Sequence, residues 1–412
     1  MWGPLARRTI IGTIRRITIR RMGLFGDRSL NLTPASVRDH RREARRRLPR
    51  QLFDYIDGGA YEESTLRANE NDLGAIELRQ RVMRDVSDIR LSTVVLGGDL
   101  RIPVVLGPVG LGGMFARRAE VQAARAAESF GVPFCESTVS ICSIEEVAEA
   151  TSAPFWYQLY VMRDRSYAED LMARAAAAGC EVLVLTVDLA VVGERYRDTR
   201  NGMTVPVGPL GKALKGLDLV RHQKWLRDVA LGGRPLTFGN LEKAVPGASS
   251  PEDFKTWVDA QFDPSVTWDD LAWVREHWNG RVVVKGVLDP ADAAAAASAG
   301  ADAVVVSNHG GRQLDGTPST ISALPGVVEA VGGRIEVLFD GGVRSGLDVL
   351  KAMALGADAV LLGRAWAWAV AGGGEAAVAQ VLHTIEKELH VAMALCGVTD
   401  VAELDRSVLL GR

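Results

Sequence analysis

From residue 102 onward the chain alternates short apolar runs, rich in Val, Ile and Leu, with longer Ala-rich segments whose apolar residues recur at helical spacing. The apolar runs are continuous and do not alternate with polar residues, which is typical of strands buried on both faces of a parallel sheet. A helical pattern follows each run, and this order is the signature of βαβ units. The predicted strands are 102–108, 132–137, 155–160, 181–188, 281–286, 301–309, 335–341 and 357–364.

Roughly eight such units close into a barrel, so the predicted fold class is α/β, a (β/α)8 TIM barrel. A doubly wound sheet is the alternative, but no G-x-G-x-x-G turn follows any apolar run. Before the barrel, "TPASVRDHRREARRRLPRQLFDYIDGGA" predicts capped helices that end at Gly58 and Gly59. After the fourth strand, residues 199–266 form a long insertion. We therefore expect a barrel domain over residues 31–412, preceded by an extension over residues 1–30.

The N-terminal extension is basic. Its segment "MWGPLARRTIIGTIRRITIRRMGLFG" carries six arginines and no acidic residue, with Ile10, Ile14 and Ile17 at helical spacing. The apolar stretch is too interrupted for a signal peptide. One interpretation is a basic helix at a membrane interface. The favoured alternative is a disordered tail, or a start assigned too early, with Met22 nearer the true start.

The insertion mixes Leu, Val and Trp with basic residues in "GPLGKALKGLDLVRHQKWLRDVALGGRPL". Two interpretations stay open, a lid that rests on an anionic membrane surface and a solvated pair of helices. The first places a peripheral membrane contact in residues 205–235. A spanning helix is not expected, because no run of about 18 uncharged apolar residues occurs.

Composition narrows the function classes. A net charge of −3 and a pI near 6.1 give no basic footprint, so a small-molecule partner is expected and nucleic acid is not. The four cysteines show no C-x-x-C spacing, so neither a metal site nor a disulfide framework is predicted. The absence of C-x-x-C-H also argues against a fused cytochrome. These features suit a reducing cytoplasm.

The ends of the predicted strands are unusually polar. In this barrel fold catalytic groups lie at the carboxyl ends of the strands. A single His or Lys there is more often structural, but polar residues recur at nearly every strand end, which favours a functional site. The candidates are Pro108, Val109, Gly110, Ser137, Gln158, Tyr160, Thr186, Asp188, Lys285, His309, Arg312, Asp340, Gly342, Gly363 and Arg364.

The segments "FDGGVRSG" and "LLGRA" follow the seventh and eighth predicted strands. Their glycines, with Arg344 and Arg364, stand where this fold binds phosphate through backbone N–H groups and a helix N-terminus. The alternative is a pair of ordinary left-handed turns. We predict a phosphorylated cofactor or substrate.

A proton acceptor and an anion clamp share one strand end. Imidazole titrates near neutral pH, so His309 is the candidate general base, and Asp188 could orient the ring and stabilise its cation. Arg312 can bind a carboxylate bidentately, with Arg195 assisting. Together these groups suit an α-hydroxy or α-keto acid, for which hydroxyl contacts are offered by Tyr55 and Tyr160.

Lys285 ends the fifth strand and admits two roles. A buried lysine can form a Schiff base with a carbonyl substrate. A fixed cation beside a delocalised ring instead stabilises the reduced, anionic form of that ring.

Several of these segments resemble the FMN-dependent enzymes that oxidise L-2-hydroxy acids, a family that includes glycolate oxidase, mandelate dehydrogenase and L-lactate dehydrogenase. The shared motifs are "FDYIDGGA", "WYQLYV", "LTVD", "VVKGV", "SNHGGRQLD" and "DGGVRSG…GADAVLLGRA", in the same order from about residue 33 to residue 410. Within the family, "DGGAYEESTL", "ELRQRVMRDVSD" and "GPVGLGGMFARR" most resemble the bacterial respiratory L-lactate dehydrogenases.

The resemblance assigns roles to positions of this chain. It implies His309 as the base with Asp188 as its partner, and substrate binding by Tyr55, Tyr160, Arg195 and Arg312. Contacts with the flavin ring and ribityl chain are implied for Pro108, Val109, Gly110, Ser137, Gln158, Thr186 and Lys285. Contacts with the ribityl chain and phosphate are implied for Asp340, Gly342, Arg344, Gly363 and Arg364.

The function implied is FMN-dependent oxidation of an L-2-hydroxy acid, foremost L-lactate to pyruvate, with electrons passing to a quinone or another respiratory acceptor. L-mandelate dehydrogenase and a glycolate or other hydroxy acid oxidase are alternatives, although Gly110 stands where oxidases resembling glycolate oxidase carry Ala. A flavin-free aldolase that uses Lys285, or a non-catalytic binding scaffold, would belong to other classes. The resemblance also implies a homo-oligomer, a tetramer, located in the cytoplasm or on the cytoplasmic face of the inner membrane.

Overall fold

The computed structural model describes residues 32–205, 207–244 and 260–411. Nearly all of the described residues belong to one compact unit, Ser36–Arg412. The basic extension predicted for residues 1–30 lies outside the described residues, as does part of the insertion.

Eight parallel strands form one sheet in the order β3-β10-β9-β8-β7-β6-β5-β4. A parallel bridge between Leu106 and Phe134 joins the two ends of this order, so the sheet closes into a barrel. Each strand coincides with one predicted run, which confirms the barrel, and β7 extends one residue beyond its run. The strands are β3 (Val104–Leu106), β4 (Cys135–Ser137), β5 (Trp156–Tyr160), β6 (Val182–Thr186), β7 (Arg281–Val287), β8 (Ala303–Val306), β9 (Glu336–Phe339) and β10 (Ala359–Leu362).

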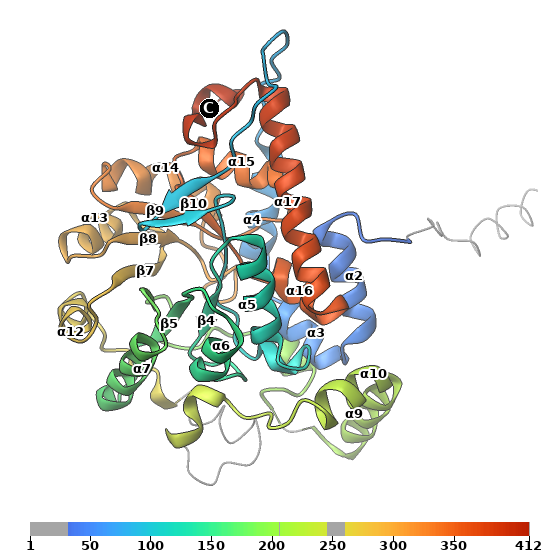
Figure 1. Cartoon of the computed structure of the whole chain (residues 1–412). Helices are drawn as coiled ribbons and strands as arrows, with labels where there is room; N and C mark the ends of the chain where they lie inside the picture. Colours follow the sequence, from blue (N-terminus) through green and yellow to red (C-terminus); the bar gives the residue numbers. More distant parts are fainter. Residues whose placement is uncertain (1–31, 206, 245–259, 412) are drawn as a thin grey trace, which may run out of the picture. The chain divides into compact units, whose positions relative to one another are not determined.

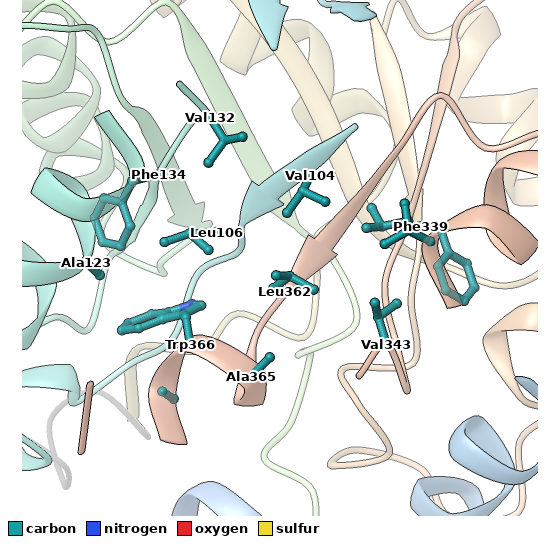
Figure 2. Close-up of a cluster of buried hydrophobic side chains, with 14 of the residues drawn as sticks. Val104, Leu106, Ala123, Val132, Phe134, Phe339, Val343, Leu362, Ala365 and Trp366 are labelled. Carbon is teal, nitrogen blue, oxygen red and sulfur yellow. The ribbon is translucent and has the colours of Figure 1, made fainter. Parts of the chain in front are cut away.

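Helices surround the barrel, as Figure 1 shows. Their inner faces bury Ala, Val and Leu against the strands, and Figure 2 shows one such contact, where Trp366 packs beside Leu106 and Phe134. The indole N–H of Trp366 donates to Gly107 O at 2.9 Å, so this buried ring carries no unpaired donor. The surrounding helices are α5 (Ala119–Phe130), α6 (Ile144–Ala150), α7 (Arg165–Ala177), α12 (Asp269–His277), α13 (Pro290–Ser298), α14 (Thr320–Val331), α15 (Gly346–Ala354), α16 (Arg364–Gly373) and α17 (Glu375–Cys396).

A short hairpin lies at the amino ends of the strands. It pairs β1 (Thr93–Val95) with β2 (Gly98–Leu100), and its apolar residues join the core inside the barrel. Both carboxylate oxygens of Glu336, the first residue of β9, accept the backbone N–H of Leu96, at 2.9 and 3.0 Å. The hairpin therefore covers the amino end of the barrel, opposite the carboxyl ends where the candidate residues lie.

Three helices precede the barrel: α2 (Val37–Arg47), α3 (Arg50–Asp57) and α4 (Ser64–Ala75). The first two confirm the predicted helical segment, whereas α4 follows Gly59 and was not predicted. Ser36 caps α2 through a capping box with Asp39. The helix α3 ends at Gly58, as predicted, and α2 packs against α16. The N-terminal helices therefore pack on the helices that surround the barrel.

The insertion after β6 is partly helical. It contains α8 (Tyr196–Arg200), α9 (Pro209–Arg221), α10 (Gln223–Trp225), a π-helical turn (Leu226–Leu231) and a 3-10 turn (Gly239–Ala244). Trp225 anchors it, because the buried indole donates to Met114 O at 2.8 Å. Asn240 forms a second anchor, since it is fully buried and its amide oxygen accepts Ile144 N–H at 2.8 Å. None of the helices in the described ranges is long and apolar enough to cross a bilayer.

Candidate active site

Strand register places several predicted site residues beside one another. Tyr160 on β5 pairs with Thr186 on β6, and Thr186 pairs with Lys285 on β7. One strand earlier, Ser137 on β4 pairs with Gln158 on β5. All five are buried, and all lie toward the carboxyl ends of their strands. These predicted candidates therefore lie side by side along one part of the barrel mouth, as expected from the sequence.

His309 follows β8 and takes a left-handed backbone conformation, with φ of 55°. Its backbone N–H donates to Ser307 Oγ at 3.1 Å, which stabilises the turn. The ring nitrogen Nδ1 lies 2.9 Å from Asp188 Oδ1, so the pair predicted from two distant motifs is formed. The His309 side chain stays 23% exposed, whereas that of Asp188 is 12% exposed. The imidazole is therefore partly accessible to a reactant, while its Nδ1 is oriented by the Asp188 carboxylate.

Burial alone would raise the pKa of Asp188, but the neighbouring His309 and Lys285 outweigh it, and the net result is a lowered pKa. Asp188 thus stays a carboxylate that stabilises positive charge on the imidazole. Room for it comes from Gly286, where β7 is irregular and φ is +114°. A Cβ at Gly286 would lie 2.6 Å from Asp188 Cβ, so a larger residue would displace the acid.

Lys285 is 5% exposed and held at two points. Its Nζ donates to Ser307 Oγ at 2.9 Å and lies 3.1 Å from Asp340 Oδ2. Burial lowers the pKa of this amine, but Asp340 and then Asp188 outweigh burial, so the pKa is raised. An amine that keeps its proton is a poor nucleophile, so this arrangement fits the fixed-cation role and disfavours the Schiff-base role.

Two guanidinium groups lie over one aromatic ring. The Cζ atoms of Arg312 and Arg195 are 4.9 and 5.5 Å from the ring centroid of Tyr55. Burial, and then the nearby Arg195, lower the pKa of Arg312. Two cations this close favour an anion between or beside them. Tyr160 is also buried, and burial followed by the charge of Asp188 raises its pKa, so it retains a hydroxyl proton to donate.

Several buried polar atoms have no hydrogen-bond partner among the described residues, which is unusual unless a ligand supplies one. They include Gln158 Nε2, Asp340 Oδ1 and Arg344 Nε. The Gln158 amide is oriented, because its oxygen accepts from Ser137 Oγ at 3.0 Å and from Thr138 N–H at 3.3 Å. A free donor, a free acceptor and a free guanidinium N–H match the carbonyl, hydroxyl and phosphate groups of FMN.

Glycines shape the predicted phosphate end. At Gly342, φ is +91° and a Cβ would lie 2.4 Å from Asn69 O, so no side chain fits. At Gly363 a Cβ would meet only Val109 Cγ2, at 4.0 Å, so the backbone there borders open space. Val109, with Pro108 and Gly110, follows β3 and is only partly buried. These positions leave room for a bound group where the sequence predicted one.

Arg344 and Arg364 border a polar cavity of about 150 Å³ that Trp368 also lines. Arg344 Nη2 lies 3.1 Å from Glu70 Oε1, and its Cζ lies 4.8 Å from the Trp368 ring centroid. Burial is the main cause of a lowered pKa in both arginines. An anion that neutralises these buried cations, such as a phosphate, would stabilise the site.

Arg364 also has a structural role that sequence reasoning missed. Its Nε, Nη1 and Nη2 donate to the carbonyls of Ile56, Gly310 and Gly58 at 3.0, 2.9 and 2.8 Å. Since a guanidinium has five N–H donors, some remain for an anion. Arg364 thus ties α3 to the loop that carries His309.

Two other residues were not identified from the sequence. Ser307 supports both Lys285 and the His309 backbone. The amide of Gln313 donates to Asp188 O at 2.9 Å and accepts Gly193 N–H at 3.1 Å, which joins the loops after β6 and β8. Both lie inside the quoted motif "SNHGGRQLD", so their position next to His309 was the available signal.

A family model described as FMN-dependent dehydrogenase matches residues 44–410, and the chain belongs to that family. It therefore binds FMN and is an oxidoreductase. The flavin-free aldolase and the non-catalytic scaffold considered above are wrong.

Individual members of the family and solved structures are also similar to this chain. The chain is 55% identical over 378 residues to L-lactate dehydrogenase of Caulobacter vibrioides (strain NA1000 / CB15N), covering 92% of this chain and 98% of that protein. It is 52% identical over 372 residues to L-lactate dehydrogenase of Pectobacterium atrosepticum, covering 90% and 96%. Among solved structures, the monotopic membrane protein (S)-mandelate dehydrogenase matches with a TM-score of 0.86 at 35% identity, covering 92% of this chain and all of that one.

Proposed function

We propose that this protein oxidises L-lactate to pyruvate and passes the electrons to a respiratory acceptor. The names of the relatives at 52 to 55% identity support L-lactate as the substrate. One structural observation carries the proposal: the His309–Asp188 pair, at 2.9 Å, shares a strand end with Arg312, whose guanidinium lies over Tyr55.

The side chains divide the chemistry among them. Arg312 and Arg195 bind the substrate carboxylate, and this fixes the orientation of the α-carbon. Tyr55 and Tyr160 contact the remaining polar oxygens. His309 accepts a proton from the substrate, and Asp188 stabilises the imidazolium that results.

FMN, when bound, accepts the two electrons that leave the α-carbon. Gln158, Ser137 and Thr186 would hold its ring, and Lys285 supplies a fixed positive charge. The groups after β9 and β10 would hold its ribityl chain and phosphate. L-lactate loses two electrons and two protons to become pyruvate. His309 takes one proton, and the two electrons with the other proton would pass to the flavin.

The substrate preference is tested by steady-state kinetics with a soluble dye as acceptor. We expect kcat/KM for L-lactate to exceed that for L-mandelate and for glycolate by about tenfold or more, the scale on which pockets discriminate side chains. L-mandelate is the second candidate, because a mandelate dehydrogenase is a close structural neighbour. A higher kcat/KM for L-mandelate would replace the proposed substrate within the same reaction.

The acceptor is proposed to be a quinone, reached at a membrane surface on the cytoplasmic side. Support comes from α9, all of whose side chains are at least partly exposed. Leu210, Leu214 and Leu217, spaced four and three apart, are 75, 59 and 48% exposed on one stripe of this helix. Lys215 on another side donates to Gly202 O at 2.8 Å, which fixes the helix to the preceding loop. A membrane is also the setting named for the mandelate dehydrogenase neighbour.

Replacing Leu210, Leu214 and Leu217 together by serine should lower binding to vesicles containing phosphatidylglycerol by at least about tenfold, since each buried CH₂ contributes about 0.8 kcal/mol. Activity with a soluble dye should stay unchanged. The matched control replaces Val391 and Leu395, which are exposed on α17, by serine. Equal vesicle binding by both variants, or none by the unaltered protein, would favour the solvated pair of helices.

We also propose that the chain forms a homo-oligomer, a tetramer by resemblance to its family. The segment 79–91 offers an apolar contact surface, because Val82 and Met83 at its tip are 73 and 99% exposed. Next to these two residues, Arg81 N–H donates to Leu395 O at 2.9 Å, which fixes the segment to α17.

A further inference from the structure

The carboxyl end of α3 is a meeting point for the substrate-binding groups. Tyr55 lies in its last turn, and the carbonyls of this turn carry partial negative charge because they have no helical partner. Arg312 Nη1 donates to two of them, Tyr55 O at 2.6 Å and Gly58 O at 2.9 Å. One arginine of the carboxylate clamp is therefore positioned directly by the helix that carries Tyr55.

Asp57 ends the same helix, where a negative charge is unfavourable because it adds to the negative end of the helix dipole. The carboxylate is nevertheless ionised and buried, with a side-chain exposure of 2%. Arg41 compensates it through two bonds, from Nε at 2.5 Å and Nη2 at 2.7 Å. Burial raises the pKa of Asp57, but Arg41 and then Arg197 outweigh it, so the pKa is lowered.

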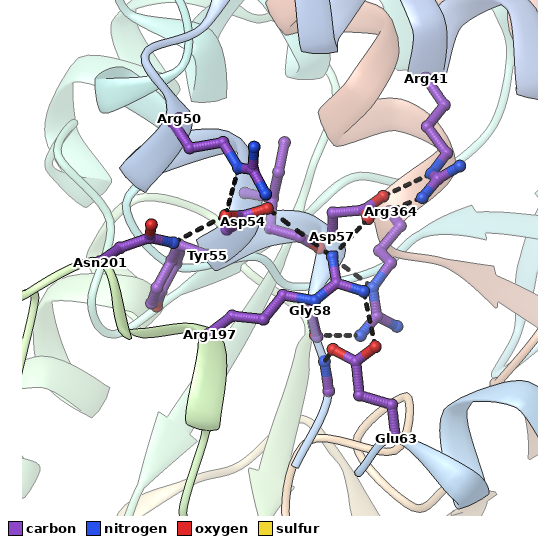
Figure 3. Close-up of polar contacts among 12 residues, drawn as sticks. Arg41, Arg50, Asp54, Tyr55, Asp57, Gly58, Glu63, Arg197, Asn201 and Arg364 are labelled. Atoms are coloured by element: carbon purple, nitrogen blue, oxygen red, sulfur yellow. Dashed lines mark hydrogen bonds and ion pairs between the residues drawn. The ribbon is translucent and has the colours of Figure 1, made fainter. Parts of the chain in front are cut away.

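Arg197 is the second partner, and it comes from the other side of the site. It lies on α8, two residues after Arg195, and its Nη1 donates to Asp57 Oδ2 at 2.9 Å. Its Nη2 donates to Glu63 Oε2 at 2.6 Å, and the other oxygen of Glu63 accepts Gly59 N–H at 3.0 Å. Figure 3 shows Arg197 reaching between the two carboxylates beside Gly58.

We propose that Arg197 is a positioning residue for the substrate-binding site, because its bridge to Asp57 and Glu63 fixes the loop that carries Arg195 against the helix that carries Tyr55. This inference deepens the proposed function and rests on its assignment of Arg195 and Tyr55 to the substrate.

The need for such a bridge follows from the charges. The guanidiniums of Arg195 and Arg312 both lie over the Tyr55 ring, at 5.5 and 4.9 Å, and like charges repel. Arg195 also pairs with Asp198 of its own loop, Nη1 to Oδ2 at 3.4 Å, but this pair does not join the loop to α3. Because Arg312 is bonded to α3, repulsion would move Arg195 away together with its loop. Besides the Arg197 bridge, a backbone bond from Tyr61 N–H to Glu194 O, at 2.9 Å, and a bond from Asn201 Nδ2 to Asp54 Oδ2, at 2.7 Å, cross this boundary.

Loss of the Arg197 bridge should weaken substrate binding more than it slows turnover. Arg195 contacts the substrate carboxylate, which is equally charged before and during oxidation. Losing such a contact raises KM and leaves kcat nearly unchanged, because ground state and transition state lose the same interaction. A residue that only stabilised the fold would instead lower the melting temperature and leave both kinetic constants unchanged.

The experiment compares Arg197→Gln with the unaltered holoenzyme and with Arg200→Gln. Arg200 lies on the same helix and is exposed, with its guanidinium 5.5 Å from the Tyr196 ring centroid, so it is a matched control. For Arg197→Gln we expect KM for L-lactate to rise about 10- to 100-fold, as misplacement of about 1 Å does, while kcat changes less than about threefold. Arg197→Lys should restore part of the loss, since one ammonium replaces only part of the fork.

Two further measurements distinguish failure of the proposed function from failure of the Arg197 inference. Oxalate, a dicarboxylate that needs no turnover, should perturb the flavin absorbance of Arg197→Gln only at higher concentration. Amide hydrogen exchange at Tyr61 and over residues 194–201 should be faster in Arg197→Gln and unchanged in Arg200→Gln. If the unaltered protein fails to oxidise L-lactate, the proposed function fails, while hydrogen exchange still tests the bridge.

Unchanged KM and oxalate affinity in Arg197→Gln would overturn the inference, and so would loss of FMN, which would assign Arg197 to the cofactor. If Arg197→Gln does not fold, Glu63→Gln takes its place, because it weakens one half of the bridge and leaves Asp57 paired with Arg41. A rise in KM of about 3- to 10-fold is then expected, and no change would overturn the inference.

Discussion

Replacing His309 by glutamine should slow flavin reduction by L-lactate about 10²- to 10⁴-fold, because the substrate proton loses its positioned acceptor. Glutamine keeps a polar side chain of similar reach but cannot accept a proton at neutral pH. The rate of flavin reduction is measured by mixing enzyme with L-lactate anaerobically in a stopped-flow instrument. The matched control is His383→Gln, since His383 lies on α17 and its side chain is 61% exposed.

The affinity for oxalate should be nearly unchanged in His309→Gln, because the arginines that bind carboxylates are intact. Asp188→Asn should also slow reduction, but by less, since the imidazole remains while its cation is stabilised less well. If His309→Gln reduced its flavin at the rate of the unaltered protein, His309 would not be the general base.

Replacing Arg312 by lysine should lower kcat/KM for L-lactate about 10²- to 10³-fold, equivalent to about 3 to 4 kcal/mol of transition-state stabilisation. Arg312 serves two partners at once: its Nη1 donates to the carbonyls of Tyr55 and Gly58, and the rest of its fork is left for the carboxylate. A lysine ammonium cannot span both. Kinetics with the soluble dye, together with FMN content and melting temperature, measure the effect.

Arg101→Lys is the control for this substitution, because Arg101 pairs with Glu386 on the outside of the barrel, at 2.6 Å. A loss below about threefold in Arg312→Lys would show that a simple positive charge suffices, and the bidentate clamp would be wrong.

The sequence predicted the barrel well, because each strand is a continuous apolar run buried on both faces and followed by a helical pattern. The hairpin β1–β2 escaped prediction, since its strands are only Thr93–Val95 and Gly98–Leu100 and carry too few residues for a period of two. Strand bounds were predicted too long where turns follow, as at Asp188 and His309, which lie beyond β6 and β8. When polar site residues follow the apolar run directly, the apolar pattern does not show where the strand ends.

The proximity of the candidate site residues was predictable where they end a strand, because the barrel brings the carboxyl ends of all its strands to one mouth. The contacts that hold these residues in place could not be predicted from the sequence. Asp57 and Arg197 are 140 positions apart, and nothing in a local pattern tells that α3 and α8 meet. The same holds for Gly286, whose lack of a side chain makes room for Asp188 across a strand pair. Such contacts depend on tertiary packing, which periodicity does not encode.

The most direct measurement is an anaerobic single turnover of the purified full-length protein. FMN is first released from a sample and counted per chain, and L-lactate is then added to the remainder in the absence of any acceptor. The account predicts one FMN per chain, rapid bleaching of its absorbance, and one pyruvate formed per FMN. Protein that carries FMN but is bleached by none of L-lactate, L-mandelate and glycolate would contradict it.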